Sequence, residues 1–278
     1  MLSSGDDMML MLNSEPRMIA NFDTLIYMER LNRISFALLN TSHPGNIGAA
    51  ARAMKVMGMS DLRLMTPTDY PSAEATARAS GADDVLYHAT VVDDVDQAIA
   101  DSTLVMGTSA RTRGMDIPVI GMREAAELLM KHTVNGRASL LFGKERYGMT
   151  NEEMQRCHYL VNFPANPEYS SLNLASAVQL AAYELRMQCL LTQDSVPIEE
   201  EGVPFATMDK MDSFYQHLFG VLERVEFMKG ENSKSLEEKF RMMFNRLRIE
   251  RHEMDILRGM LSAINKQLSK DWLNKFFN

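Results

Sequence analysis

The feature that most restricts the possible folds of this chain is a junction that occurs three times. In each junction an apolar run of strand length leads into a polar loop and then into a helical pattern. The junctions lie at residues 34–55, 138–153 and 159–191. Strands that alternate with helices favour an α/β fold with a mostly parallel sheet that is covered on both faces. Ligands bind such a sheet at the carboxyl ends of its strands, where these three polar loops lie.

The same alternation extends over residues 33–190. It predicts strands at residues 33–40, 61–65, 84–87, 103–107, 139–142 and 159–163. Helices are predicted between them at residues 46–57, 73–79, 92–99, 122–132, 151–156 and 172–191.

A second helical region follows an acidic segment that contains two prolines. Apolar residues at helical spacing predict three helices, at residues 211–228, 235–247 and 251–268. Ser235 and Glu238 have the spacing of a capping box, which predicts that the middle helix begins at Ser235. Because such helices cannot bury their apolar stripes alone, we expect them to pack on one another, on the α/β part or on a second subunit.

These patterns divide the chain into four parts. They are an N-terminal extension (residues 1–31), an α/β domain (32–192), a linker (193–208) and a helical C-terminal domain (209–278). Six of the 24 methionines lie within residues 1–28. We expect a poorly ordered extension there, or a start codon assigned upstream of a true start at Met28, and both explanations stay open.

Composition excludes several classes of protein. No apolar run reaches 18 residues, so we expect no membrane association, and the N-terminus lacks the features of a secretory signal. Cys157 and Cys189 are isolated from each other, which predicts a cytoplasmic protein with neither a disulfide framework nor a bound metal. Residues 143–150 lack the lysine of a P-loop, and no Gly-x-Gly-x-x-Gly motif for a dinucleotide occurs.

Charge is distributed unevenly along the chain. The net charge is −8, and residues 1–31 (−3) and 194–212 (−5) together account for all of it. From Lys229 onward, eleven basic residues face seven acidic ones, a net charge of +4. The basic residues include a cluster formed by Arg241, Arg246, Arg248 and Arg251. This pattern is compatible with phosphate contacts and equally with a solvated helix face that carries ion pairs.

The three junctions also carry a family resemblance. They contain Asn-Thr-Ser-His-Pro-Gly-Asn-Ile-Gly (40–48), Phe-Gly-Lys-Glu-Arg-Tyr-Gly (142–148) and Tyr-Ser-Ser-Leu-Asn-Leu (169–174). In this order they resemble the SPOUT superfamily of methyltransferases, and within it the TrmH-like 2′-O-ribose branch. The resemblance covers about residues 32–190 and continues more weakly to the C-terminus.

This resemblance implies a C-terminal trefoil knot in the α/β domain, a homodimer, the cofactor S-adenosylmethionine and a tRNA substrate. It is greatest to enzymes that methylate cytidine or uridine at nucleotide 32 of the anticodon loop. Two alternatives stay open. One is methylation of another tRNA site or of ribosomal RNA, and the other is a catalytically silent RNA-binding module with the same fold.

The resemblance also implies which loops hold the cofactor. The expected residues are Thr108, Ser109, Ala110, Gly143, Phe163, Ser170, Ser171 and Leu172. Loops of small residues suit adenine, and Gly143 allows close approach where a side chain would collide. The alternative for Ser170 and Ser171 is an ordinary cap of the helix that follows.

The catalytic residues that the resemblance implies are Arg52, Asn46, Glu145, Ser171 and Asn173. An arginine is always protonated, so we expect Arg52 to hold a phosphate or to lower the pKa of the ribose hydroxyl rather than to accept its proton. Glu145 is expected to pair with Arg52. The two asparagines offer amide groups that fix the ribose or order the loops.

Overall fold

The chain forms one seven-stranded sheet with helices on both faces. The computed structural model describes residues 29–109, 116–166, 168–192, 204–229 and 233–277, with backbone only at 192 and 270–277. The strands are β1 (Ile34–Leu39), β2 (Leu62–Met65), β3 (Thr90–Val92), β4 (Leu104–Thr108), β5 (Val119–Gly121), β6 (Ala138–Phe142) and β7 (Tyr159–Asn162). The helices are α2 (Pro44–Val56), α3 (Ala73–Ala79), α4 (Asp83–Tyr87), α5 (Val95–Ile99), α6 (Met122–His132), α7 (Asn151–Met154), α8 (Leu174–Thr192), α9 (Met208–Arg224), α10 (Ser233–Leu247) and α11 (Arg251–Phe277).

The strand order is β3-β2-β1-β6-β4-β7-β5, and each neighbouring pair is parallel. The predicted mostly parallel α/β sheet is therefore confirmed. Every residue of β1, β2 and β6 is buried, as expected for strands that are covered on both faces.

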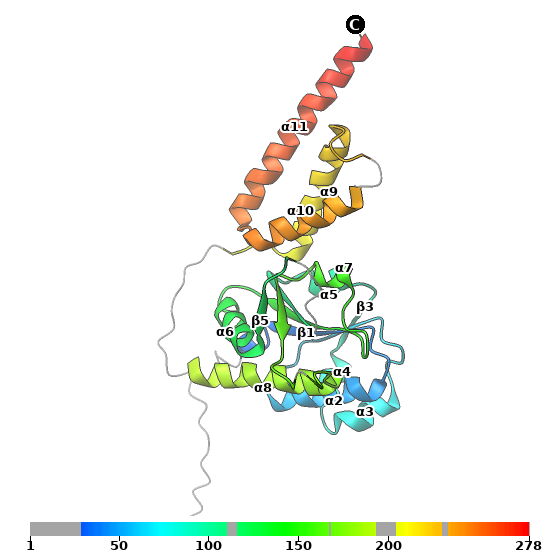
Figure 1. Cartoon of the computed structure of the whole chain (residues 1–278), viewed down its shortest axis with the longest axis vertical. Coiled ribbons are helices and arrows are strands. Elements are labelled where there is room, and N and C mark those ends of the chain that lie inside the picture. Colours follow the sequence, from blue (N-terminus) through cyan, green and yellow to red (C-terminus); the bar gives the residue numbers. More distant parts are fainter. Residues whose placement is uncertain (1–28, 110–115, 167, 193–203, 230–232, 278) are drawn as a thin grey trace, which may run out of the picture.

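One face of the sheet packs against α2, α3, α4, α6 and α8. Figure 1 shows α2, α3, α4 and α8 together on this side of the sheet. Phe36, Leu140 and Val161 point into this core. A Cβ atom on Gly48 of α2 would lie 2.0 Å from the Ala75 carbonyl oxygen of α3. Glycine is therefore required where these two helices meet.

The opposite face is covered by α5, α7 and α9. Because α5 has five residues and α7 has four, they leave much of this face to the longer α9. Phe214 and Tyr215 of α9 share a core with Val105 and Leu141 of the sheet. Figure 1 shows α9, α10 and α11 on this side. The C-terminal helices thus complete the core of the sheet, and the domain boundaries at residues 192 and 208 stay a prediction.

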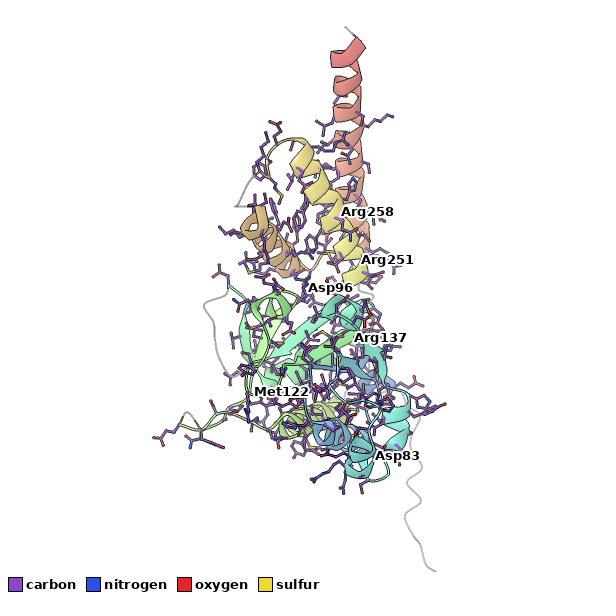
Figure 2. All side chains as sticks on the ribbon, turned by 90° about the vertical axis from the view of Figure 1, so that its right-hand side faces the viewer. Asp83, Asp96, Met122, Arg137, Arg251 and Arg258 are labelled. Atoms are coloured by element: carbon purple, nitrogen blue, oxygen red, sulfur yellow. The ribbon has the colours of Figure 1, made fainter. Side chains whose placement is uncertain are left out.

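Polar contacts also join the C-terminal helices to the α/β part. The Asn245 side-chain amide donates to the Gln155 carbonyl oxygen (3.1 Å) and its oxygen accepts from the Tyr215 hydroxyl (2.9 Å). Lys234 of α10 forms an ion pair with Glu152 of α7 (3.0 Å). Asp96 of α5 lies at the same junction, as Figure 2 shows.

The helices predicted at residues 73–79 and 122–132 are confirmed with the same bounds. The strand predicted at residues 84–87 is wrong, because this segment forms α4. Asp83 and Asp84 lie in the first turn of α4, where acidic residues favour a helix. The prediction missed β3 and β5, which have only three residues each.

The capping box predicted at Ser235 is also wrong, because α10 begins two residues earlier, at Ser233. A capping box is present instead in α7, where Thr150 accepts from the Glu153 backbone and the Glu153 side chain accepts from the Thr150 backbone. No helix in the described ranges is long and apolar enough to span a membrane.

The shared core predicts a large effect of a mutation in α9. Phe214→Ala should lower the free energy of unfolding by about 3–5 kcal/mol, because it removes a buried aromatic ring and leaves a cavity under the sheet. Urea denaturation measures this difference. Phe227→Ala, at a phenylalanine that is 61% exposed, is the matched control and should change stability by less than about 0.5 kcal/mol. Equal effects of the two substitutions would contradict this account of the second core.

Candidate active site

The first polar loop, at residues 40–48, does not line the cavity at this edge of the sheet. The loops that follow β4, β6 and β7 meet at the carboxyl edge and line a cavity of about 440 Å³. They meet because β4 lies between β6 and β7, so the loops that follow these three strands are neighbours. The predicted cofactor residues on the cavity wall are Thr108, Ser109, Gly143, Phe163, Ser170, Ser171 and Leu172. Ala110 lies outside the described residues.

Gly143 begins a loop that folds back on itself. Lys144 and Gly148 form an antiparallel bridge, and the Gly148 backbone N–H donates to the Lys144 carbonyl oxygen (2.8 Å). A Cβ atom on Gly143 would lie 2.3 Å from the Met149 nitrogen. The close approach expected at Gly143 is therefore an approach of the loop's own backbone. Glycine is required at residue 143 by the fold of the loop, whether or not a ligand is bound.

Asn173 caps α8. Its side-chain oxygen accepts from the backbone N–H groups of Ala175 (2.9 Å) and Ser176 (3.3 Å). The alternative of Ser170 or Ser171 as the cap is therefore wrong, and α8 begins at Leu174 rather than at residue 172. Both serines are exposed and line the cavity, which leaves their hydroxyl groups accessible to a ligand.

A hydrogen-bonded network centred on Glu145 joins the three motif segments, at residues 40–48, 142–148 and 169–174. The Asn46 amide donates to Glu145 Oε1 (2.9 Å), and the Ser42 backbone N–H (3.1 Å) and hydroxyl (2.9 Å) donate to Oε2. The Asn173 amide donates to the Asn46 side-chain oxygen (3.1 Å). Asn46, Glu145 and Asn173 belong to three separate motifs, and the fold places Asn46 in hydrogen-bond contact with both of the others.

These hydrogen bonds determine the charge of Glu145. Partial burial acts to raise the pKa of its carboxyl group, but hydrogen bonds from Asn46 and Ser42 outweigh burial and hold the pKa below its ordinary value. A carboxylate with a lowered pKa is a weak proton acceptor. Glu145 is therefore suited to holding the loops in place rather than to general-base catalysis.

Arg52 lies on the exposed side of α2, does not line the cavity and does not pair with Glu145. The predicted pair is wrong: the carboxylate of Glu145 accepts hydrogen bonds from Asn46 and Ser42 instead. No ion pair of Arg52 with another residue in the described part of the chain is found. Its guanidinium group is thus available to an external anion.

Sequence reasoning missed several residues of the cavity wall. They are Lys144, Arg146, Tyr147, Met149, Asn162, Ala165, Leu174 and Ala177, together with Phe142 and Gly148. Arg146 has a φ of 71°, which is uncommon for a residue other than glycine. The two glycines that bound residues 143–148 are the signal that could have identified this loop as a whole.

The parallel sheet and the cavity at its carboxyl edge define an α/β protein with a ligand site formed by loops. Residues 33–183 match the SpoU rRNA Methylase family, and residues 209–272 match the C-terminal domain of the tRNA methyltransferase TrmJ. The chain belongs to the SpoU methylase family, and the resemblance drawn from the three motifs is confirmed.

Three similar proteins extend this result. The tRNA (cytidine/uridine-2′-O-)-methyltransferase TrmJ of Photorhabdus laumondii is 44% identical over 240 residues, 86% of this chain and 100% of the relative. The crystal structure of TrmJ from Zymomonas mobilis ZM4 has a TM-score of 0.74 at 32% identity, and covers 83% of this chain and 98% of its own. The structure of a probable methylase family protein from Haemophilus influenzae has a TM-score of 0.56 at 39% identity, and covers 87% of this chain and 99% of its own.

The lowered pKa of Glu145 predicts a pH dependence of stability. Its hydrogen bonds stabilise the fold fully above the ordinary glutamate pKa of 4.5, and this contribution is lost as the pH falls through the lower pKa of the folded state. The difference in unfolding free energy between wild type and Glu145→Gln should therefore be constant near neutral pH and shrink as the pH falls below 4.5. Urea denaturation at several pH values measures it, and Ser42→Ala should reduce the same pH dependence. A difference that grows on acidification would refute this role.

Proposed function

We propose that this protein transfers a methyl group from S-adenosylmethionine to a ribose 2′-hydroxyl of tRNA. The observation that carries the proposal is the cavity at the carboxyl edge, whose wall includes residues of two family motifs, at 142–148 and 169–174, and residues of the loop after β4. Membership of the SpoU methylase family and the similarity to TrmJ proteins over most of the chain support the reaction and the substrate.

The residues of the cavity fit this cofactor. A volume of about 440 Å³ is within the usual range for small-molecule sites. Phe163 and Leu172 offer apolar surface, and Ser109, Ser170 and Ser171 offer polar groups on the same wall. When bound, S-adenosylmethionine supplies an activated methyl group.

The remaining site residues position the substrate. Glu145, Asn46 and Asn173 hold the three loops in register through their hydrogen bonds. Ser171 presents its hydroxyl at the cavity, where the cofactor and the ribose meet under this proposal. Arg52 holds the phosphate beside the target ribose, because its guanidinium is exposed and permanently charged.

The target within tRNA is the finer part of the proposal. We infer cytidine or uridine, as the TrmJ relatives are named for these two nucleosides, and place the nucleotide at position 32 of the anticodon loop. Methylation of another tRNA site or of ribosomal RNA, and an RNA-binding module without activity, are the competing functions. A tRNA substrate implies a cytoplasmic location.

A tRNA transcript with a single 2′-deoxynucleotide tests the target. Wild-type protein with S-adenosylmethionine should make the unmodified transcript resistant to alkaline cleavage after nucleotide 32. A 2′-deoxy group at nucleotide 32 should abolish methyl transfer because the acceptor oxygen is missing, and the same change at nucleotide 31 is the control. Undiminished transfer to the 32-deoxy transcript would exclude that position, and no transfer to any tRNA would exclude the activity.

Substitutions of Arg52 test its role. Arg52→Ala should lower turnover by roughly 100-fold, as removal of one charge-stabilising donor does in other enzymes, while the affinity for S-adenosylmethionine stays unchanged. Arg52→Lys should recover little of this loss if the planar guanidinium group of Arg52 donates two parallel hydrogen bonds to the phosphate, which lysine cannot do. Lys55→Ala, one turn further along α2, is the matched control and should have little effect. Near-normal turnover of Arg52→Ala would remove Arg52 from the active site.

We also propose the knot and the homodimer that the SPOUT resemblance implies. In the sheet, β7 lies between β4 and β5, so the chain that leads into β7 passes between two strands that precede it. The link from β4 to β5 contains residues outside the described ranges. In support of a dimer, α8 exposes the apolar side chains of Leu180, Tyr183, Leu190 and Leu191.

The C-terminal helices are proposed to contribute to tRNA binding, but the four arginines of the predicted cluster differ in their surroundings. Arg241 forms an ion pair with Asp212 (2.7 Å), and Arg248 is half-buried. Arg246 and Arg251 are exposed and are the residues of this cluster that suit contacts with the RNA surface.

A further inference from the structure

A second cavity, of about 290 Å³, lies at the opposite edge of the sheet from the proposed active site. On its wall, Thr103 directly precedes β4 and Gly136 lies two residues before β6, so this is the amino edge of the parallel strands. The other side of the wall comes from the base of the C-terminal helices, through Phe205, Arg248 and Glu250. The proposed methyl transfer does not use this cavity.

The backbone places Arg248 in this wall. The Ala206 N–H donates to the Ile249 carbonyl oxygen (2.8 Å), and the Arg251 N–H donates to that of Pro204 (3.0 Å). This pairing joins the segment before α9 to the turn between α10 and α11. Arg248 begins that turn with a φ of 49°, a strained conformation for a residue other than glycine.

The guanidinium of Arg248 has no negative partner in the described part of the chain. Its carbon lies 4.2 Å from the centre of the Phe205 ring, and Nη2 is 2.8 Å from Nδ1 of His132. Burial, followed by the charge of Arg248, lowers the pKa of His132 to about 3, so the ring is neutral and accepts this hydrogen bond. The Arg248 Nε is buried and makes no hydrogen bond.

Such a cation is costly, because a charge removed from water is normally balanced by a counterion or by hydrogen bonds. Burial lowers the pKa of Arg248, as expected for a charge that is not balanced. The wall also carries Lys131, which pairs with Glu127 (2.8 Å), and Glu250, which lies 3.3 Å from a nitrogen of His252. Because Glu127 balances Lys131, the charge at the cavity that has no carboxylate partner among the described residues is that of Arg248.

We propose that this cavity is a binding site for a phosphate group, with Arg248 as its main ligand and Lys131 as a second. Arginine suits phosphate because its planar fork donates two parallel hydrogen bonds. The source of the group is a backbone phosphate of the RNA substrate, and this part rests on the proposed function. The exposed Arg251, whose backbone is joined to Pro204 of the wall, offers another arginine beside the cavity.

Thermal unfolding with inorganic phosphate as the probe tests the pocket itself. At constant ionic strength, replacing sodium chloride by sodium phosphate should raise the melting temperature of wild type, and Arg248→Gln should abolish the rise. Lys131→Gln should reduce it, and this variant provides the test if Arg248→Gln fails to fold, because Lys131 is 68% exposed.

Arg258→Ala is the matched control, since Arg258 is an exposed arginine of the same helix as Arg251, further along α11 in Figure 2 and absent from the cavity wall. It should keep the full response to phosphate. An equal loss in Arg258→Ala, or no response of wild type, would overturn the proposal.

The salt dependence of tRNA binding tests the source of the phosphate. Arg248→Gln should weaken binding at least about tenfold, the loss expected for a hydrogen bond to a charged group. The slope of log affinity against log salt should fall by about 0.7–0.9, the value for one phosphate contact. Affinity for S-adenosylmethionine should stay unchanged. An unchanged slope in a variant that no longer responds to phosphate would overturn the RNA source in favour of a free phosphate compound. The phosphate response is measured without RNA, so it stands even if wild type methylates no tRNA.

Discussion

A parallel sheet must be covered on both faces, and the rest of this structure depends on how the second face is covered. The first face has long helices, α2, α6 and α8, that come from the α/β pattern itself. The second has only α5 and α7, which together contribute nine residues of helix. Helix α9 supplies the missing apolar surface, with Phe214 and Tyr215 almost fully buried. The C-terminal segment is therefore part of the hydrophobic core.

The two edges of the sheet have different chemistry for the same geometric reason. All strands point one way, so the loops that follow them gather at one edge and the loops that precede them gather at the other. At the carboxyl edge, Glu145, Asn46 and Asn173 link three loops around the proposed cofactor cavity. At the amino edge, the turns before β4 and β6 meet the base of the C-terminal helices. The half-buried charge of Arg248 lies at this contact.

The C-terminal helices also explain why a basic sequence segment need not be a basic surface. Arg241 balances Asp212 at the junction with the sheet, and the Arg241 guanidinium lies over the ring of Tyr215 at 4.6 Å. Only part of the net positive charge of this segment is therefore available to RNA. Arg248 is not part of an open basic surface either, since it faces a cavity rather than open solvent. Positions in the fold, not the count of arginines, decide which of them remain open to an external anion.

The sequence alone determined the α/β class and the mostly parallel sheet. Hydrophobic periodicity is a local property, and it predicted α3 and α6 to the residue. Seven of the eight residues that the family resemblance assigns to the cofactor lie on the wall of one cavity, and their contact with the cofactor stays a prediction. Only the tertiary structure decided the pairings. Asn173 caps α8 although Ser170 and Ser171 are equally good caps by type, because the chain turns into the helix only at Leu174. Glu145 binds Asn46 and Ser42 instead of Arg52, since partners separated by about a hundred residues are chosen by the packing of α2 against the sheet. The short strands β3 and β5 form because a neighbouring strand offers its edge, which no local pattern records.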